Sequence, residues 1–169
     1  VSQKEWKQEA TDKAIKEELT MLIEELTALR AVKRAAIKGG AKILRSHMFV
    51  VAKYLANGEF ERMKARLVAD GRDQDPEMYP NKASPTVAIH SVFAALGLAS
   101  TKAWQIVVKI DIKGAFIQTP MTGEKIYMRL DPKMTKYAVE LYPELGRMVE
   151  TDGCLYMEML KAMYGCVQA

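Results

Sequence analysis

Apolar residues at helical spacing mark the first part of the chain, and they are Ile15, Leu19, Leu22, Leu26 and Leu29. Alternating steps of four and three residues place these side chains on one stripe of a helix. The pattern predicts a long helix from Lys4 to Ala36, ended by Gly39-Gly40. The stripe suits packing within the chain's own domain or a coiled coil through which the chain self-associates. We favour the first, because the pattern covers little more than two heptads.

A β-hairpin is predicted after this helix. The segment from Ile43 to Tyr54 is rich in apolar and β-favouring residues, and Asn57-Gly58 is typical of a two-residue hairpin turn. The returning strand is expected from Phe60 to Ala69. A polar loop from Arg72 to Ser84 then separates the hairpin from the rest of the chain.

The remaining sequence alternates between predicted helices and strands. We expect helices at Pro85–Ala99 and Pro132–Leu145, and strands at Gln105–Ile110, Ile126–Leu130 and Cys154–Met159. The first of these strands is almost entirely apolar and β-branched, which is typical of a strand buried on both faces. This order predicts an α+β fold, with a helical segment at residues 1–40 and a second unit at residues 41–169.

Composition narrows the function only slightly. Hydrophobic residues make up 49% of the 169 residues, which is enough for a core, and the net charge is +4. This balance is compatible with a polyanionic partner without being specific for one. No apolar run is long enough to cross a bilayer, so no membrane partner is expected. Two cysteines and two histidines, at their spacing, do not form a zinc site.

Asp111 is the first candidate for chemistry. It ends the predicted buried strand, where a carboxylate could bind a divalent cation such as Mg²⁺ or could cap the following turn. The small residues Gly114 and Ala115 leave room for a ligand near the backbone, and Phe116 adds a flat wall. These neighbours favour the ligand-binding interpretation.

Lys64 and Arg66 are the second candidate. Strand periodicity places both side chains on one face of the predicted hairpin. Two adjacent cations could bind a triphosphate, with arginine offering bidentate geometry. The alternative is a solvated edge strand whose charges discourage aggregation, and the two residues by themselves favour that alternative.

Four segments, taken in order, resemble the reverse transcriptase domain of Ty1/copia-type retrotransposons. The family pattern K-A-R-L-V-A-x-G is matched by Lys64 to Gly71, and S-P-T-V by Ser84 to Val87. The pattern D-[VI]-K-x-A-F is matched by Asp111 to Phe116, and L-x-K-A-L-Y-G-L-x-Q-A in most positions from Met159 to Ala169. The likeness extends from about Leu44 to the end of the sequence.

The resemblance implies a polymerase palm and fingers, with deoxynucleotides added to a primer 3′ end by two-metal phosphoryl transfer. Asp111 would be a catalytic, metal-binding aspartate, and Ile112 would offer its backbone to the metal or the triphosphate. Phe116 would contact the sugar and exclude a 2′-hydroxyl. The implied cofactors are two Mg²⁺ ions, with Mn²⁺ as an alternative.

The resemblance also implies binding residues and partners. Lys64 and Arg66 would contact the incoming deoxynucleoside triphosphate, and Tyr164, Gly165 and Gln168 would lie near the nascent base pair. The partners would be an RNA or DNA template-primer and deoxynucleoside triphosphates. The implied location is intracellular, in cytoplasmic virus-like particles or the nucleus.

The resemblance leaves a second hypothesis for function. The family's aromatic-x-Asp-Asp hairpin follows the last matched motif and is absent from this sequence, so we expect an incomplete palm that is inactive alone. The alternative to a piece of an active polymerase is therefore a catalytically dead retroelement remnant that acts at most as a nucleic-acid-binding module.

Overall fold

The computed structural model describes residues 3–74, 87–102, 106–108, 110, 112–121 and 123–167, except for the side chains of residues 3–6, 73 and 116. Within these ranges the chain combines helices with a five-stranded sheet of order β1-β5-β4-β2-β3. The strands are β1 (Leu29–Val32), β2 (Ile43–Tyr54), β3 (Phe60–Ala69), β4 (Tyr127–Leu130) and β5 (Leu155–Met159). Neighbouring strands run antiparallel, except that β2 and β4 are parallel.

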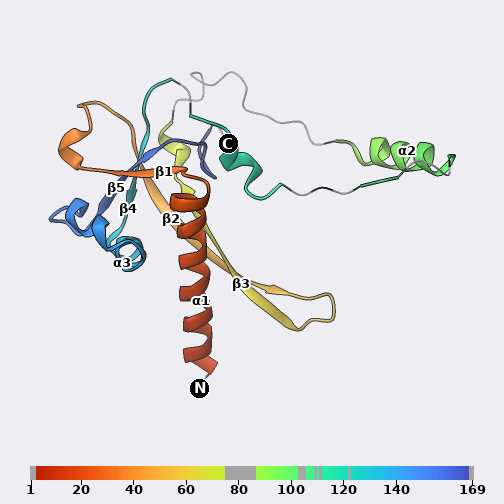
Figure 1. The fold of residues 1–169 in the computed structure, drawn as a ribbon, viewed down its shortest axis with the longest axis horizontal. Coiled ribbons are helices and arrows are strands. Elements are labelled where there is room, and N and C mark those ends of the chain that lie inside the picture. Colours follow the sequence, from red (N-terminus) through yellow and green to blue (C-terminus); the bar gives the residue numbers. More distant parts are fainter. Residues whose placement is uncertain are drawn as a thin grey trace.

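Two helices cover the sheet, and a third stands apart from it (Figure 1). Helix α1 (Gln3–Thr20) continues into a π-helical turn (Met21–Glu25) and packs against β3 and α3 (Pro132–Leu141). Helix α2 (Ile89–Ser100) projects away from the sheet and buries none of its residues. Short 3₁₀ turns lie at Arg34–Ala36, Gly71–Asp73, Ala115–Gln118 and Pro143–Met148. No described helix meets the length and apolarity needed to span a bilayer.

The predicted hairpin is confirmed, with β2 and β3 at the predicted bounds. The loop is longer than the predicted two-residue turn. The Leu55 amide donates to the Glu59 carbonyl at 2.8 Å, and this hydrogen bond encloses three residues. Gly58 adopts a φ of 84°, a conformation that glycine accepts without strain. The loop therefore has the three-residue form with glycine in the left-handed position.

The predicted helix from Lys4 to Ala36 is wrong in its second half. The helical turns end at Glu25, Thr27 takes a φ of 46°, and Leu29 begins strand β1. Strand β1 pairs along its whole length with β5, and these long-range bonds replace the local helical bonds. The apolar stripe still packs within the domain, as favoured above, since Ile15, Leu19 and Leu22 are core residues.

The predicted buried strand at Gln105–Ile110 is also wrong where the structure describes it. Residues 106–108 and 110 form no strand, and Ile106 is 86% exposed. Apolar, β-branched composition favours a strand only when a neighbouring strand completes its hydrogen bonds. No described strand pairs with this segment. The helix predicted at Pro85–Ala99 begins at Ile89, and Pro85 itself lies outside the described residues.

Candidate functional site

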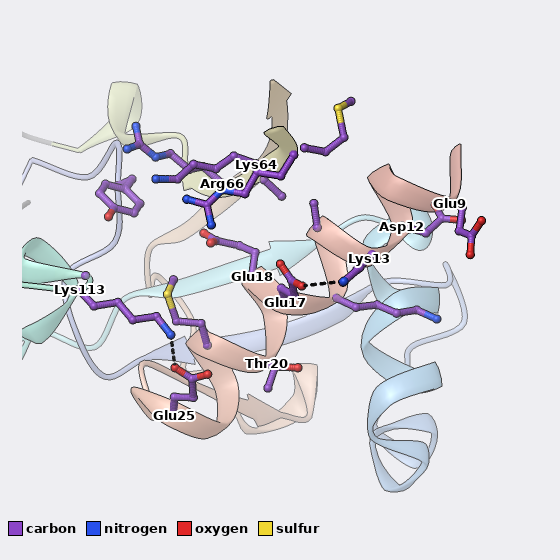
Figure 2. Close-up of a pocket in the computed structure, with 18 of the residues that line it drawn as sticks. Glu9, Asp12, Lys13, Glu17, Glu18, Thr20, Glu25, Lys64, Arg66 and Lys113 are labelled. Carbon is purple, nitrogen blue, oxygen red and sulfur yellow. Dashed lines mark hydrogen bonds and ion pairs between the residues drawn. The ribbon is translucent and has the colours of Figure 1, made fainter. Parts of the chain in front are cut away.

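A cleft of about 1560 Å³ is lined by residues of helix α1, strand β3 and the segment 112–115. Figure 2 shows acids and Lys13 on the α1 wall of the cleft, facing Lys64 and Arg66 on the other wall. The α1 wall carries four acids and two lysines, namely Glu9, Asp12, Glu17, Glu18, Lys13 and Lys16. The β3 wall carries the cations Arg62, Lys64 and Arg66. Lys113 and Glu25 also line the cleft and form an ion pair, with the Lys113 Nζ and Glu25 Oε2 atoms 2.7 Å apart.

Arg66 stacks on an aromatic ring at the edge of the cleft. Its guanidinium carbon lies 5.2 Å from the centroid of the Tyr164 ring, a cation–π distance. The stack restrains the arginine while leaving its N–H groups able to donate along the guanidinium edge. Among the described residues neither Arg66 nor Lys64 forms an ion pair, so both charges remain available to an anion.

Backbone bonds bring Tyr164 to the end of β3. The Ala69 amide donates to the Tyr164 carbonyl at 2.8 Å, and the Val167 amide donates to Gln74 Oε1 at 2.9 Å. Gly165 has a φ of 86°, and a Cβ atom there would collide with the Ala69 carbonyl oxygen. The contact therefore requires glycine at this position. This docking places the Tyr164 ring beside Arg66.

The outer face of the β2–β3 hairpin alternates cations with apolar side chains. Its cross-strand pairs are Phe49 with Arg66, Val51 with Lys64, and Lys53 with Arg62. Phe49 is 58% exposed and Val51 is 55% exposed. The opposite face of β3 carries the buried Ala65 and Leu67. A surface of this kind suits single-stranded nucleic acid, whose phosphates need cations and whose bases stack on flat apolar groups.

Glu18 joins helix α1 to the edge of the sheet. Its side chain is buried, and Oε1 accepts a hydrogen bond from the Leu67 amide at 3.0 Å. Burial raises the pKa of the Glu18 carboxyl above its ordinary value of 4.5. The Leu67 hydrogen bond and the positive charges of Arg66 and Lys64 act in the opposite direction, without cancelling the effect of burial.

The structure brings some of the residues proposed from the sequence together. Those that line the cleft are Lys64, Arg66, Ile112 and Tyr164. Gly165 docks beside it, through the backbone contacts described above. Three residues are not placed: Asp111 and Gln168 lie outside the described residues, and of Phe116 only the backbone, in the turn at Ala115–Gln118, is described.

Two features of the site were missed in the sequence. Phe49 and Val51 occupy alternate positions of β2, so a strand pattern could have shown that they share a face. Glu18 had no comparable signal. It adjoins the apolar stripe of α1, and only the packing of α1 along β3 shows that it meets the Leu67 amide.

The described acids form no evident metal centre. Within the described ranges no three histidine, cysteine, aspartate or glutamate side chains gather closely enough to hold an ion. Asp131 caps α3 by accepting a hydrogen bond from the Met134 amide, and Asp152 accepts one from the Cys154 amide in a turn. Both aspartates thus have local structural roles. Cys154 and Cys166 are buried thiols that are not joined in a disulfide.

Comparison with known proteins gives the origin of the chain. It is 32% identical over 119 residues to the "Retrovirus-related Pol polyprotein from transposon RE1" of Arabidopsis thaliana. It is 37% identical over 119 residues to the "Retrovirus-related Pol polyprotein from transposon RE2" of the same plant. Each match covers 69% of this chain. The chain is of retrotransposon Pol origin.

The Pol relatives are far longer than this chain. The matched region spans 7% of each polyprotein. No family model matches the chain, and no solved structure gives a significant match. The similarity therefore relates this chain to one short region of a retrotransposon Pol polyprotein.

Proposed function

We propose that the chain is part of the fingers and palm of a copia-type reverse transcriptase, an RNA-directed DNA polymerase. The observation that carries this proposal is the gathering of Lys64, Arg66, Tyr164 and Ile112 around one cleft. These four residues come from three separate motifs that resemble the family. The similarity to retrovirus-related Pol polyproteins supports the same assignment.

In this proposal β3 binds the phosphates of an incoming deoxynucleoside triphosphate. Arg66 would donate two parallel hydrogen bonds to one phosphate group, and Lys64 would add a second positive charge. Tyr164 would keep the guanidinium in place through the stacking contact. Phe49 and Val51, on the same face of the hairpin, would contact bases of the template strand.

The proposed metal ligands are oxygen atoms, which suit Mg²⁺ or Mn²⁺. They are the carboxylate of Asp111 and the backbone carbonyl of Ile112, a residue at the cleft. When bound, the ions would supply charge stabilisation to the attacking and leaving oxygens of an in-line displacement. Phe116, two positions past the cleft residue Gly114, would exclude a ribose 2′-hydroxyl.

A second candidate is a nucleic-acid-binding module without catalysis. The exposed outer face of the hairpin favours it, since a row of cations beside Phe49 binds a single strand without any metal. Both candidates require nucleic-acid binding through β3. They differ in whether Asp111 is essential for a reaction.

Binding by β3 is tested with the 169-residue chain and a single-stranded oligonucleotide. The double variant Lys64→Gln/Arg66→Gln should weaken binding and lower the slope of log affinity against log salt by about 1.4, from two lost phosphate contacts. The matched control is Lys133→Gln/Lys136→Gln, which removes two exposed charges on α3. Equal losses in the two double variants would contradict specific binding by β3.

Catalysis is tested in a Pol polyprotein that contains this chain. Asp111→Asn should abolish nucleotide addition and leave binding of a primer–template duplex unchanged. Synthesis that survives this substitution would remove Asp111 from its proposed role. A polyprotein that binds the duplex but is inactive even with Asp111 intact would favour the module without catalysis.

A further inference from the structure

Glu18 is an unusual residue for its position. It is 8% exposed and lies on α1 between the core residues Ile15 and Leu22. Burying a carboxylate costs free energy unless hydrogen bonds and opposite charges compensate for the lost water. Its hydrogen bond to the Leu67 amide needs only an acceptor oxygen, which a glutamine would also supply. The hydrogen bond therefore leaves the negative charge unexplained.

The negative charge of Glu18 lies next to two positive charges. Lys64 and Arg66 precede Leu67 on β3, and both stabilise the Glu18 carboxylate electrostatically. Figure 2 shows the Glu18 side chain pointing from α1 toward the Lys64 and Arg66 side chains. No ion pair within 4 Å involves Glu18 in the described part of the chain. The carboxylate thus acts on the two cations through space and does not block their N–H groups.

We propose that Glu18 is an internal counter-charge that sets how strongly Lys64 and Arg66 bind phosphate. Its negative charge offsets part of the positive charge of Lys64 and Arg66 when the cleft holds no anion, and it repels each phosphate that enters. This opposition grows with the negative charge of the ligand, so Glu18 lowers the affinity for a polyphosphate more than the affinity for a single phosphate. This inference rests on the proposed role of β3 in binding phosphates.

Other charged and titratable groups also face the cleft. Glu17 is paired with Lys13 at 4.0 Å, and its side chain is 64% exposed. Glu25 is paired with Lys113. The further groups are Glu9, Asp12, Lys16, Arg62 and Tyr164. Water screens the exposed charges more than the buried carboxylate of Glu18.

The first test compares Glu18→Gln with Glu17→Gln in the full chain, by calorimetric titration with inorganic tripolyphosphate at a pH at which the NMR titration described below shows the Glu18 carboxyl to be ionised. Both variants remove one negative charge from adjacent positions of α1, and the Glu18→Gln variant would keep an acceptor for the Leu67 amide. We expect Glu18→Gln to bind about fivefold more tightly and Glu17→Gln to change less than about twofold. With inorganic monophosphate the gain from Glu18→Gln should be smaller. Equal effects of the two variants would overturn the proposal.

The second test needs no added ligand. Titration of the Glu18 carboxyl by NMR should give a higher pKa in Arg66→Gln than in the unsubstituted chain, because a stabilising positive charge is gone. An unchanged pKa of the Glu18 carboxyl would overturn the proposal that Glu18 is a counter-charge to Arg66, even if the chain binds anions. Failure of the proposed function has a different signature: Lys64→Gln/Arg66→Gln would bind tripolyphosphate as well as the unsubstituted chain. That result would also contradict the proposal that Glu18 sets the affinity for phosphate.

Discussion

Replacing Gly165 by alanine tests how the segment that carries Tyr164 is held against β3. Gly165 has a φ of 86°, and an added Cβ would meet the Ala69 carbonyl oxygen and a methyl group of Val68. Gly58, at the tip of the hairpin, has a φ of 84° and has no atom within 4 Å of the same added Cβ. Both substitutions therefore place a non-glycine residue in the left-handed region, but only Gly165→Ala also creates a steric clash.

The expected magnitudes follow from that difference. Gly58→Ala should cost about 1–2 kcal/mol, for a non-glycine residue in the left-handed region. Gly165→Ala should cost about 2 kcal/mol more, because the overlap displaces the backbone. The bonds at risk join the Ala69 amide to the Tyr164 carbonyl and the Val167 amide to Gln74. Each is worth about 1 kcal/mol.

Urea and thermal unfolding followed by circular dichroism would measure both variants. For a chain of this size the extra ~2 kcal/mol corresponds to a melting temperature about 4–8 °C below that of Gly58→Ala. The NMR resonances of the Arg66 guanidinium should also move in Gly165→Ala, because the Tyr164 ring shifts away from it. Equal stabilities, with the Arg66 resonances unchanged, would show that the close approach at Gly165 does not hold this segment.

Three further predictions address the core, the pH dependence of stability and sugar selection. Leu22→Ala should destabilise the chain by about 2–5 kcal/mol in urea unfolding, because Leu22 is fully buried; a loss below ~1 kcal/mol would contradict its place in the core. The hydrogen bond that the Tyr137 hydroxyl donates to Asp12 raises the pKa of Tyr137 to about 12. The contribution of this bond to the stability of the fold is therefore present below about pH 10 and is lost as the pH rises toward 12. Tyr137→Phe should accordingly be less stable than the unsubstituted chain at about pH 8 and approach it near pH 12, and a constant difference would refute this. Phe116→Ala in an active Pol polyprotein should permit ribonucleotide incorporation in primer extension, and unchanged discrimination would remove Phe116 from its role.

The hairpin was predictable because its determinants are local. Alternating apolar and polar residues and the Asn57-Gly58 turn all lie within one stretch of sequence, and strand bounds followed directly. The faces of β3 were predictable for the same reason, since alternation separates Lys64 and Arg66 from the buried Leu67. The residue types on this strand thus indicated a cationic surface before any packing was known.

The long helix and the buried strand failed because pairing between distant segments decides both. Leu29 continues the helical stripe in sequence, yet its backbone pairs with Met159 in β5. Residues 106–108 have the composition of a core strand, yet no described strand pairs with them. Local propensity is a weak guide where backbone hydrogen bonds can be made either locally or across a sheet.

The position of α1 links the candidate site to the stability of the fold. Strand β3 is an edge of the sheet, and an uncovered edge invites pairing with another chain. Glu18 accepts the hydrogen bond of one edge amide, that of Leu67, while Ile15 and Leu19 cover the apolar face. The predicted boundary at residue 40 would therefore separate the two walls of the cleft. A chain beginning at residue 41 would keep Lys64 and Arg66 but lose α1, strand β1 and the core residues Ile15, Leu19 and Leu22, so it should aggregate rather than keep the cleft.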